Sequence, residues 1–294
     1  MKSLLLAVGT LACSLSIGCG GVGLPLPEKE LQDIVARLGA GDAADDATLA
    51  PDVVRLNEIL LEAFNGAYQP IPEDQLVPFD VSKPQNYTAI DAFRWGFGLT
   101  AYATVPESVG ALVARPVSAN YSTLFPLMVT GNWAVVLSPT NFRSYERVFA
   151  DGADQQLIAG STDRAEAVNH VVNLAPKGIV FQYDSDVVLR RVRDANLPSG
   201  EALLYWEQIA APAVNLTGNY NAYLTFLRNF QITIPFTDKL SWEFISAWSV
   251  SGGSVFIFSA GVSSGDIGAG IRNDFVDLES YLTAQGLSCG THCT

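Results

Sequence analysis

The chain has 294 residues, of which 30 are acidic and 17 basic, so its formal net charge at pH 7 is −13. Hydrophobic residues make up 49% of the sequence and charged residues 16%, a composition too apolar for a disordered chain. The negative charge repels polyanions, which argues against nucleic-acid binding.

Residues 1–18 have the layout of a secretory signal peptide. Lys2 supplies the positive start, a short apolar stretch follows, and small residues close it. The dipeptide Gly18-Cys19 resembles the lipobox of bacterial lipoproteins, in which cleavage leaves an acylated Cys at the new N-terminus. The resemblance implies that Cys19 is the first mature residue and the lipid attachment site. Ser16 stands where that pattern usually has Leu, and cleavage by an ordinary signal peptidase is the alternative.

Two helices are predicted next. The apolar residues of 28–38 fall on one helical face, and Gly39 follows as a stop signal. Residues 40–50 are rich in Ala, Gly and Asp and predict a flexible connection. A second helix is predicted over 51–64, because Pro51 suits a first helical turn.

Composition shifts divide the whole chain into segments. Several prolines follow the second predicted helix and indicate a linker before a larger domain. The predicted segments are a signal peptide over 1–18, an N-terminal helical segment over 19–69, a Pro-rich linker over 70–85, a main domain over 86–288 and a Cys-containing tail over 289–294.

The first half of the main domain mixes predicted strands and helices. Apolar runs around a Thr-Gly-Asn turn indicate a hairpin, and apolar residues at helical spacing indicate helices. The predicted elements are a hairpin of strands 127–129 and 133–137, a helix over 163–174, a strand over 179–183, a helix over 185–195, and two segments that fit either type, 203–209 and 220–230.

The clearest hairpin joins residues 241–250 to residues 254–260 through two glycines. Its large aromatic residues share one parity while Glu243 has the other, which predicts that one face is buried. A glycine-rich stretch over 261–270 and a closing helix over 272–284 follow. These elements predict an α+β fold, with a mainly antiparallel sheet and interspersed helices after a short N-terminal helical segment.

Asp184-Ser185-Asp186 is the sharpest local motif. Two carboxylates at this spacing at a strand end can hold one divalent cation. The stretch resembles the Asp-x-Asp element of metal-dependent glycosyltransferases, which implies a metal site at Asp184 and Asp186. The alternative is that Asp184 or Ser185 caps the following helix, since both residue types accept hydrogen bonds from free N–H groups.

Two of the four cysteines lie in the tail. Cys289 and Cys293 are predicted to form a disulfide, which export to an oxidising compartment permits. With His292 they could instead supply three zinc ligands, but a structural zinc site normally needs four.

The function predicted from these features is that of an exported, lipid-anchored protein of the bacterial cell envelope, in the outer membrane or periplasm, or of a secreted protein. A binding or structural role is favoured over catalysis, because no nucleophile stands beside a recognisable base and His170 is the one histidine outside the tail. The membrane is the expected partner, through the anchor. No cofactor is expected. The alternative is a metal- or carboxylate-dependent enzyme acting on carbohydrate, with Asp184 and Asp186 as its residues and a divalent cation.

Overall fold

The computed structural model describes residues 28–39, 45–63, 77–80, 109–131, 133–137, 142–175, 178–217, 222–252 and 264–289. The helices in these ranges are α1 (Glu28–Gly39), α2 (Asp46–Ala63), α4 (Tyr121–Thr130), α5 (Trp133–Val136), α6 (Ala153–Ala159) and α7 (Ser264–Ala284). The strands are β1 (Val77–Asp80), β2 (Val109–Val117), β3 (Phe142–Phe149), β4 (Arg164–Ala175), β5 (Ile179–Arg193), β6 (Glu201–Ile209), β7 (Val214–Asn215), β8 (Tyr223–Pro235) and β9 (Ser241–Gly252).

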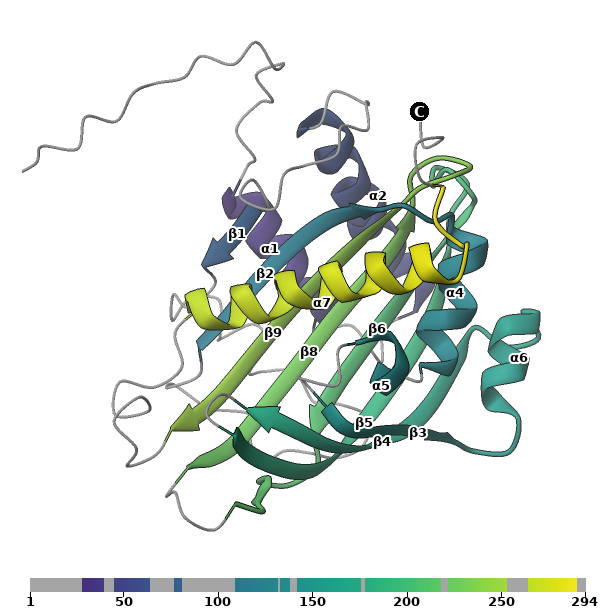
Figure 1. Cartoon of the computed structure of the whole chain (residues 1–294). Helices are drawn as coiled ribbons and strands as arrows, with labels where there is room; N and C mark the ends of the chain where they lie inside the picture. Colours follow the sequence, from purple (N-terminus) through teal and green to yellow (C-terminus); the bar gives the residue numbers. More distant parts are fainter. Residues whose placement is uncertain are drawn as a thin grey trace, which may run out of the picture.

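These strands form one antiparallel sheet (Figure 1). Their order is β1-β2-β9-β8-β6-β5-β4-β3, and β7 pairs with β5 outside this path. Most neighbours in the sheet are also neighbours in the chain, as short antiparallel connections produce. The α+β fold with a mainly antiparallel sheet is therefore confirmed.

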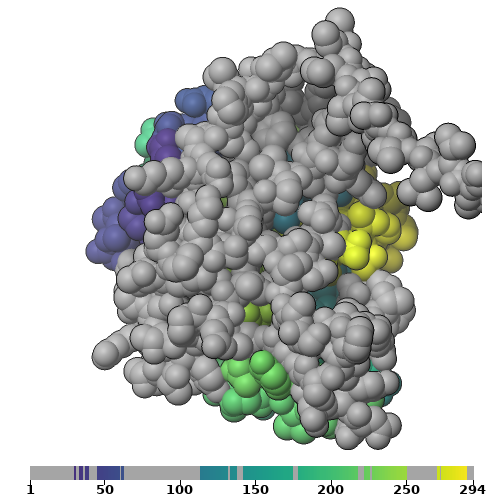
Figure 2. Space-filling model, turned by 90° about the vertical axis from the view of Figure 1, so that its left-hand side faces the viewer, coloured from purple at the N-terminus to yellow at the C-terminus, as the bar shows by residue number. Residues whose placement is uncertain are grey.

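Helices cover both faces of the sheet. We call the face that carries Val187 and Tyr205 the inner face; it packs against α4, α5, α6 and α7. The outer face carries Val188 and Trp206 and packs against α1 and α2. In Figure 2, the purple and blue of α1 and α2 and the yellow of α7 lie on opposite sides of the molecule. Two hydrophobic cores result, one on each face.

The N-terminal helices are fixed to the outer face by polar contacts as well as by apolar packing. Trp206 Nε1 donates to the Leu38 carbonyl oxygen at 2.9 Å, and Arg190 Nη2 donates to Asp46 Oδ1 at 2.9 Å. The helix predicted over 28–38 is confirmed. None of the described helices combines the length and apolarity that crossing a bilayer requires.

Helix α2 begins earlier than predicted. Asp45 Oδ1 accepts a hydrogen bond from the Thr48 backbone N–H at 2.9 Å, as an N-cap residue does. The described residues 45–50, expected in a flexible connection, therefore lie at the start of this helix, and Pro51 lies inside it.

The helices predicted over 163–174 and 185–195 are wrong, because both segments are strands, β4 and β5. In β5 the apolar residues also fit helical spacing because both faces of the strand are covered over residues 187–189, whereas β4 keeps Glu166 and His170 exposed on its outer face. Val187, Val188 and Leu189 are consecutive and all fully buried, which a strand achieves between two apolar layers. β-branched residues also favour this conformation.

The hairpin predicted over 127–129 and 133–137 is also wrong, because these residues lie in the short helices α4 and α5. The Asn120 side chain accepts from the Thr123 N–H and so starts α4. Gly131 ends it in the left-handed conformation, with φ 38°. The expected turn is thus a break between two helices.

Of the remaining predicted elements, some are confirmed and one lies outside the described residues. The strand over 179–183 and the first strand of the C-terminal hairpin, β9, are confirmed, and the two ambiguous segments are strands β6 and β8. The second hairpin strand, 254–260, lies outside the described residues. The closing helix is confirmed and begins at Ser264, within the predicted glycine-rich stretch.

Candidate functional site

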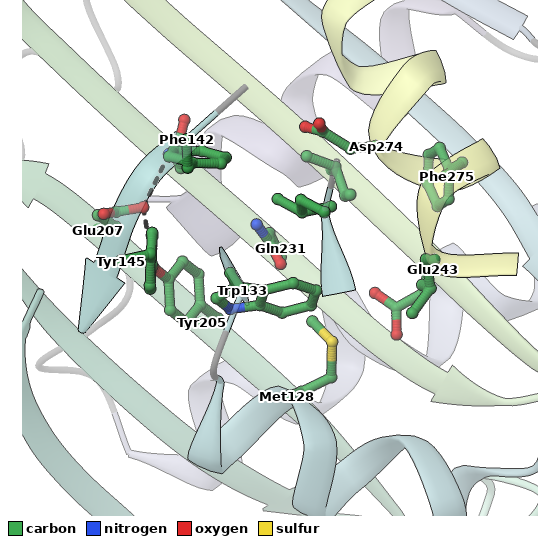
Figure 3. A pocket seen from close by; sticks show the side chains of 14 residues that line it. Met128, Trp133, Phe142, Tyr145, Tyr205, Glu207, Gln231, Glu243, Asp274 and Phe275 are labelled. Atoms are coloured by element: carbon green, nitrogen blue, oxygen red, sulfur yellow. Dashed lines mark hydrogen bonds between the residues drawn. The ribbon is translucent and has the colours of Figure 1, made fainter. Parts of the chain in front are cut away.

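A cavity of ≈ 90 Å³ lies between α7 and the inner face of the sheet, with α4 and α5 at its side (Figure 3). Trp133, Phe142, Tyr145, Tyr205 and Phe275 give it aromatic walls. These rings come from α5, β3, β6 and α7, so the cavity exists only where the helices and the sheet meet. A space of this kind, apolar with a few polar groups, is typical of a small-molecule site.

One polar wall of the cavity centres on Glu207, whose side chain is 4% exposed. Its Oε1 accepts from Asn169 Nδ2 at 2.8 Å and from Ser185 Oγ at 2.5 Å. Its Oε2 accepts from the Tyr205 hydroxyl and from Asn229 Nδ2, both at 2.8 Å. Both oxygens are therefore satisfied within the protein, which fixes the side chain without a ligand.

Arg147 of β3 contacts the residues of this polar wall and helps to hold them in place. Its Nε donates to Asn169 Oδ1 at 2.9 Å, and its Nη1 donates to the Met128 carbonyl oxygen at 2.7 Å. Its guanidinium Cζ lies 4.9 Å from the centre of the Tyr205 ring, within range of a cation–π interaction. The residue thus connects β3 to the end of α4 and holds the ring in place.

The two tyrosines of this wall keep their protons. Burial raises the pKa of Tyr145 to about 12, and the nearby Glu207 acts in the same direction. Burial, followed by Glu207, also raises the pKa of Tyr205 well above its ordinary value. Both hydroxyls are therefore hydrogen-bond donors at neutral pH.

Glu243 on β9 differs from Glu207 because neither of its carboxyl oxygens lies in a well-formed hydrogen bond with a described residue, and the Thr233 side chain acts on it less strongly than burial does. The residue is 1% exposed and lines the cavity (Figure 3). Burial raises its pKa to about 8. A buried acceptor without a partner is unfavourable, so this carboxyl is the polar group that a bound molecule would satisfy.

Both faces of β9 are buried, whereas the alternation of its residues predicted only that one face is. Glu243 and Ser249, whose parity is opposite to that of the large aromatic residues, are buried as well. The reason is that α7 and the cavity residues cover the inner face while α1 and α2 cover the outer one.

Asp184 and Asp186 lie on the outer face, away from the cavity, since they alternate with Ser185, which contacts Glu207. Asp184 Oδ1 is 2.7 Å from His170 Nδ1 of β4, and both side chains are about half exposed. Burial, and then Asp184 and Glu166, raise the pKa of Asp186. The helix-cap interpretation is wrong, because all three residues of the motif lie within β5.

The structure bears only in part on the predicted metal site and on the predicted cysteine sites. Among the described residues, no group of three or more His, Cys, Asp or Glu side chains is placed to hold a metal ion. The metal site at Asp184 and Asp186 stays a prediction. Cys289 is in a disulfide, and its backbone N–H donates to the Ser118 carbonyl oxygen at 2.7 Å. Cys19, His292 and Cys293 lie outside the described residues.

The residues of the cavity wall were missed by sequence analysis. One signal was present: Glu207 directly follows the apolar run 202–206, and Glu243 stands between Trp242 and Phe244. An acidic side chain at such a position either faces solvent or is buried together with groups that pair with it. The partners of Glu207 come from three other strands, and no local pattern identifies them.

No protein-family model matches the sequence, and no curated protein matches it. Solved structures similar to this chain include a START superfamily protein from Mycobacterium smegmatis, with 9% identity and a TM-score of 0.34 over 60% of this chain and 98% of that one. The lipid transfer and protein localization domain of human StarD13 has 14% identity and a TM-score of 0.35 over 59% of this chain and 76% of that one.

A third similar structure is dicamba monooxygenase bound to 3,6-dichlorosalicylic acid. It has 14% identity and a TM-score of 0.37, over 72% of this chain and 63% of that one. At these scores, none of the three likenesses carries a conclusion about what this chain binds.

Proposed function

We propose that this protein is an exported, lipid-anchored binding protein that holds one small, largely apolar molecule between α7 and the inner face of the sheet. The observation that carries the proposal is the cavity itself, walled by five aromatic side chains and closed on one side by polar groups. Its size fits a small ligand, since about 10–15 Å³ of this measure accommodates one water molecule.

The polar wall supports a binding role because it is already in place. Glu207 accepts four hydrogen bonds from protein groups, and Arg147 holds the neighbouring ring. A wall of this kind needs no reorganisation when a ligand enters, and pre-organisation lowers the free-energy cost of binding.

The proposed export and membrane anchoring rest on the sequence. Residues 1–18 have the layout of a signal peptide, and Gly18-Cys19 resembles a lipobox. A tethered protein with an internal cavity would carry its ligand at the surface of the membrane. The anchor and the cavity are separate parts of the proposal, and each has its own test.

The test of the cavity uses hexan-1-ol, a neutral probe chosen for its small size, and measures the rise in melting temperature with probe concentration. Leu278 lines the cavity on α7, so Leu278→Trp places an indole in the space. Leu287 is exposed beyond α7, so Leu287→Trp adds the same group outside it. We expect hexanol to stabilise the wild type and L287W but not L278W. An equal response from all three proteins would contradict the proposed site.

A further inference from the structure

Glu243 is the least satisfied polar group of the cavity. On the inner face it stands between its register partners Thr233 of β8 and Arg115 of β2. Neither carboxyl oxygen lies in a well-formed hydrogen bond with a described residue; the Thr233 side chain acts on the carboxyl group, but less strongly than burial does. The residue is 1% exposed. The side chain points into the cavity, so a molecule bound there would be placed to donate hydrogen bonds to it (Figure 3).

The charges around Glu243 are unbalanced in the acidic direction. Asp274 of α7 and Glu207 of β6 line the same cavity, and the described lining residues include no Lys, Arg or His. Arg115 stands opposite Glu243 on β2 and does not line the cavity; its Nη1 is buried without a hydrogen-bond partner. From α4, the Tyr121 hydroxyl is likewise buried without a partner. A ligand with a negative charge would meet these carboxyl groups unfavourably, whereas a cation would be attracted.

The aromatic walls favour the same kind of ligand. Trp133, Tyr145 and Phe275 present π-systems to the cavity, and the faces of such rings attract cations. Aromatic rings together with carboxyl groups are suited to an ammonium group. Because the Glu243 oxygens are acceptors, the group must also bring N–H donors, which a quaternary ammonium ion lacks.

We infer that the ligand carries a primary or secondary amine whose N–H groups bind the Glu243 carboxylate, with the apolar part of the ligand against the aromatic walls. This inference rests on the proposed function, because it names the chemical class that the same cavity takes. The amine enters as an ammonium ion and Glu243 binds it as a carboxylate. Where Glu243 is protonated beforehand, its proton is released to the buffer.

The experiment is calorimetric titration of the full chain at pH 7 with three probes of one length: hexan-1-amine, hexan-1-ol and hexanoate. We expect the amine to bind at least about tenfold tighter than the alcohol, and hexanoate to bind weakest. In Glu243→Gln the preference for the amine should disappear while hexanol binding remains. Glu146→Gln, which removes an exposed carboxylate from β3, should leave all three affinities unchanged.

Proton release gives a second test that needs no variant. Since burial raises the pKa of Glu243 to about 8, the amine should release about one proton per molecule bound at pH 6, measured in buffers of different ionisation enthalpy. Hexanol should release none. Hexanol binding without a preference for the amine, or amine binding without proton release, would overturn this inference and leave the proposed function standing. If no probe binds, the proposed function itself fails.

Discussion

The Tyr205 hydroxyl donates to Glu207 Oε2 at 2.8 Å, across two residues of the same strand. Side chains two apart on a strand share a face, so the pair forms a local unit on the inner face of β6. Asn169, Ser185 and Asn229 join the same carboxylate from β4, β5 and β8. One carboxylate therefore bonds to side chains of four strands, which makes this wall of the cavity a single structural unit.

Glu207 should accordingly contribute strongly to stability. Glu207→Ala leaves three buried donors and one partly buried donor without their acceptor, and we expect the free energy of unfolding to fall by about 2–4 kcal/mol. Urea denaturation of the variant and the wild type measures this difference. Glu166→Ala removes a half-exposed carboxylate of β4 and should change stability by less than about 1 kcal/mol. Similar losses in both variants would show that the network adds no stability.

Gly131 should tolerate no side chain. Its φ of +38° disfavours other residues, and an added Cβ would lie 2.8 Å from Arg147 Nη1 and 2.9 Å from Trp133 Nε1. Gly152 also has a positive φ, +69°, but a Cβ there meets nothing within 4 Å. Gly152→Ala should therefore lose about 1 kcal/mol from the backbone alone, and Gly131→Ala clearly more. Equal melting temperatures would mean that Arg147 and Trp133 move aside freely.

Glu243 should make stability depend on pH. Its pKa rises from 4.5 in the unfolded chain to about 8 in the folded protein, so its contribution to stability is fully present below pH 4.5 and is lost as the pH rises through 8. Glu243→Gln cannot titrate. Its stability relative to the wild type should increase between pH 4.5 and pH 8 by at most about 5 kcal/mol.

The free energy of unfolding of both proteins at several pH values measures this change, because the other titrating groups are common to both. Glu146→Gln serves as the control, since its difference from the wild type should stay nearly constant over the same range. A constant difference for Glu243→Gln as well would contradict the raised pKa.

The lipid anchor has a direct test. If Cys19 is acylated, Cys19→Ser removes the lipid attachment site and should move the protein from the membrane fraction to the soluble fraction. Stable anchoring takes two or more lipid signals, because a single acyl chain holds a protein only marginally. Cys13→Ser changes a cysteine that lies within residues 1–18 and should leave the fractionation unchanged. An unmodified N-terminus found by mass spectrometry would contradict the anchor.

The sequence predicted the fold class and several of its elements, since helix 28–38 and strand β9 have clear periodicity. It failed in β5, where both sheet faces are covered. Period-2 alternation disappears when both faces are apolar, and the continuous runs of β5 then also fit a helix. The hairpin over 127–137 was mispredicted because the Asn120 cap outweighed the turn signal.

The candidate site was harder to predict than the fold. Asp184 and Asp186 stand out in the sequence because they are adjacent to an apolar run, yet they lie on the outer face. Glu207 and Asn229 meet only because β6 pairs with β8 in a particular register, with Glu207 opposite Asn229. Local sequence patterns do not predict such pairing between distant segments.

The alternation along β6 has a consequence for how this protein can vary. Tyr205 and Glu207 belong to the cavity, while Trp206 between them bonds to the carbonyl of Leu38 on the opposite side of the sheet. A substitution at one of these positions disturbs one side alone. An inserted or deleted residue in β6 would exchange the two sides, sending the indole toward α7 and the carboxylate toward α1. The length of this strand is therefore under tighter constraint than its composition.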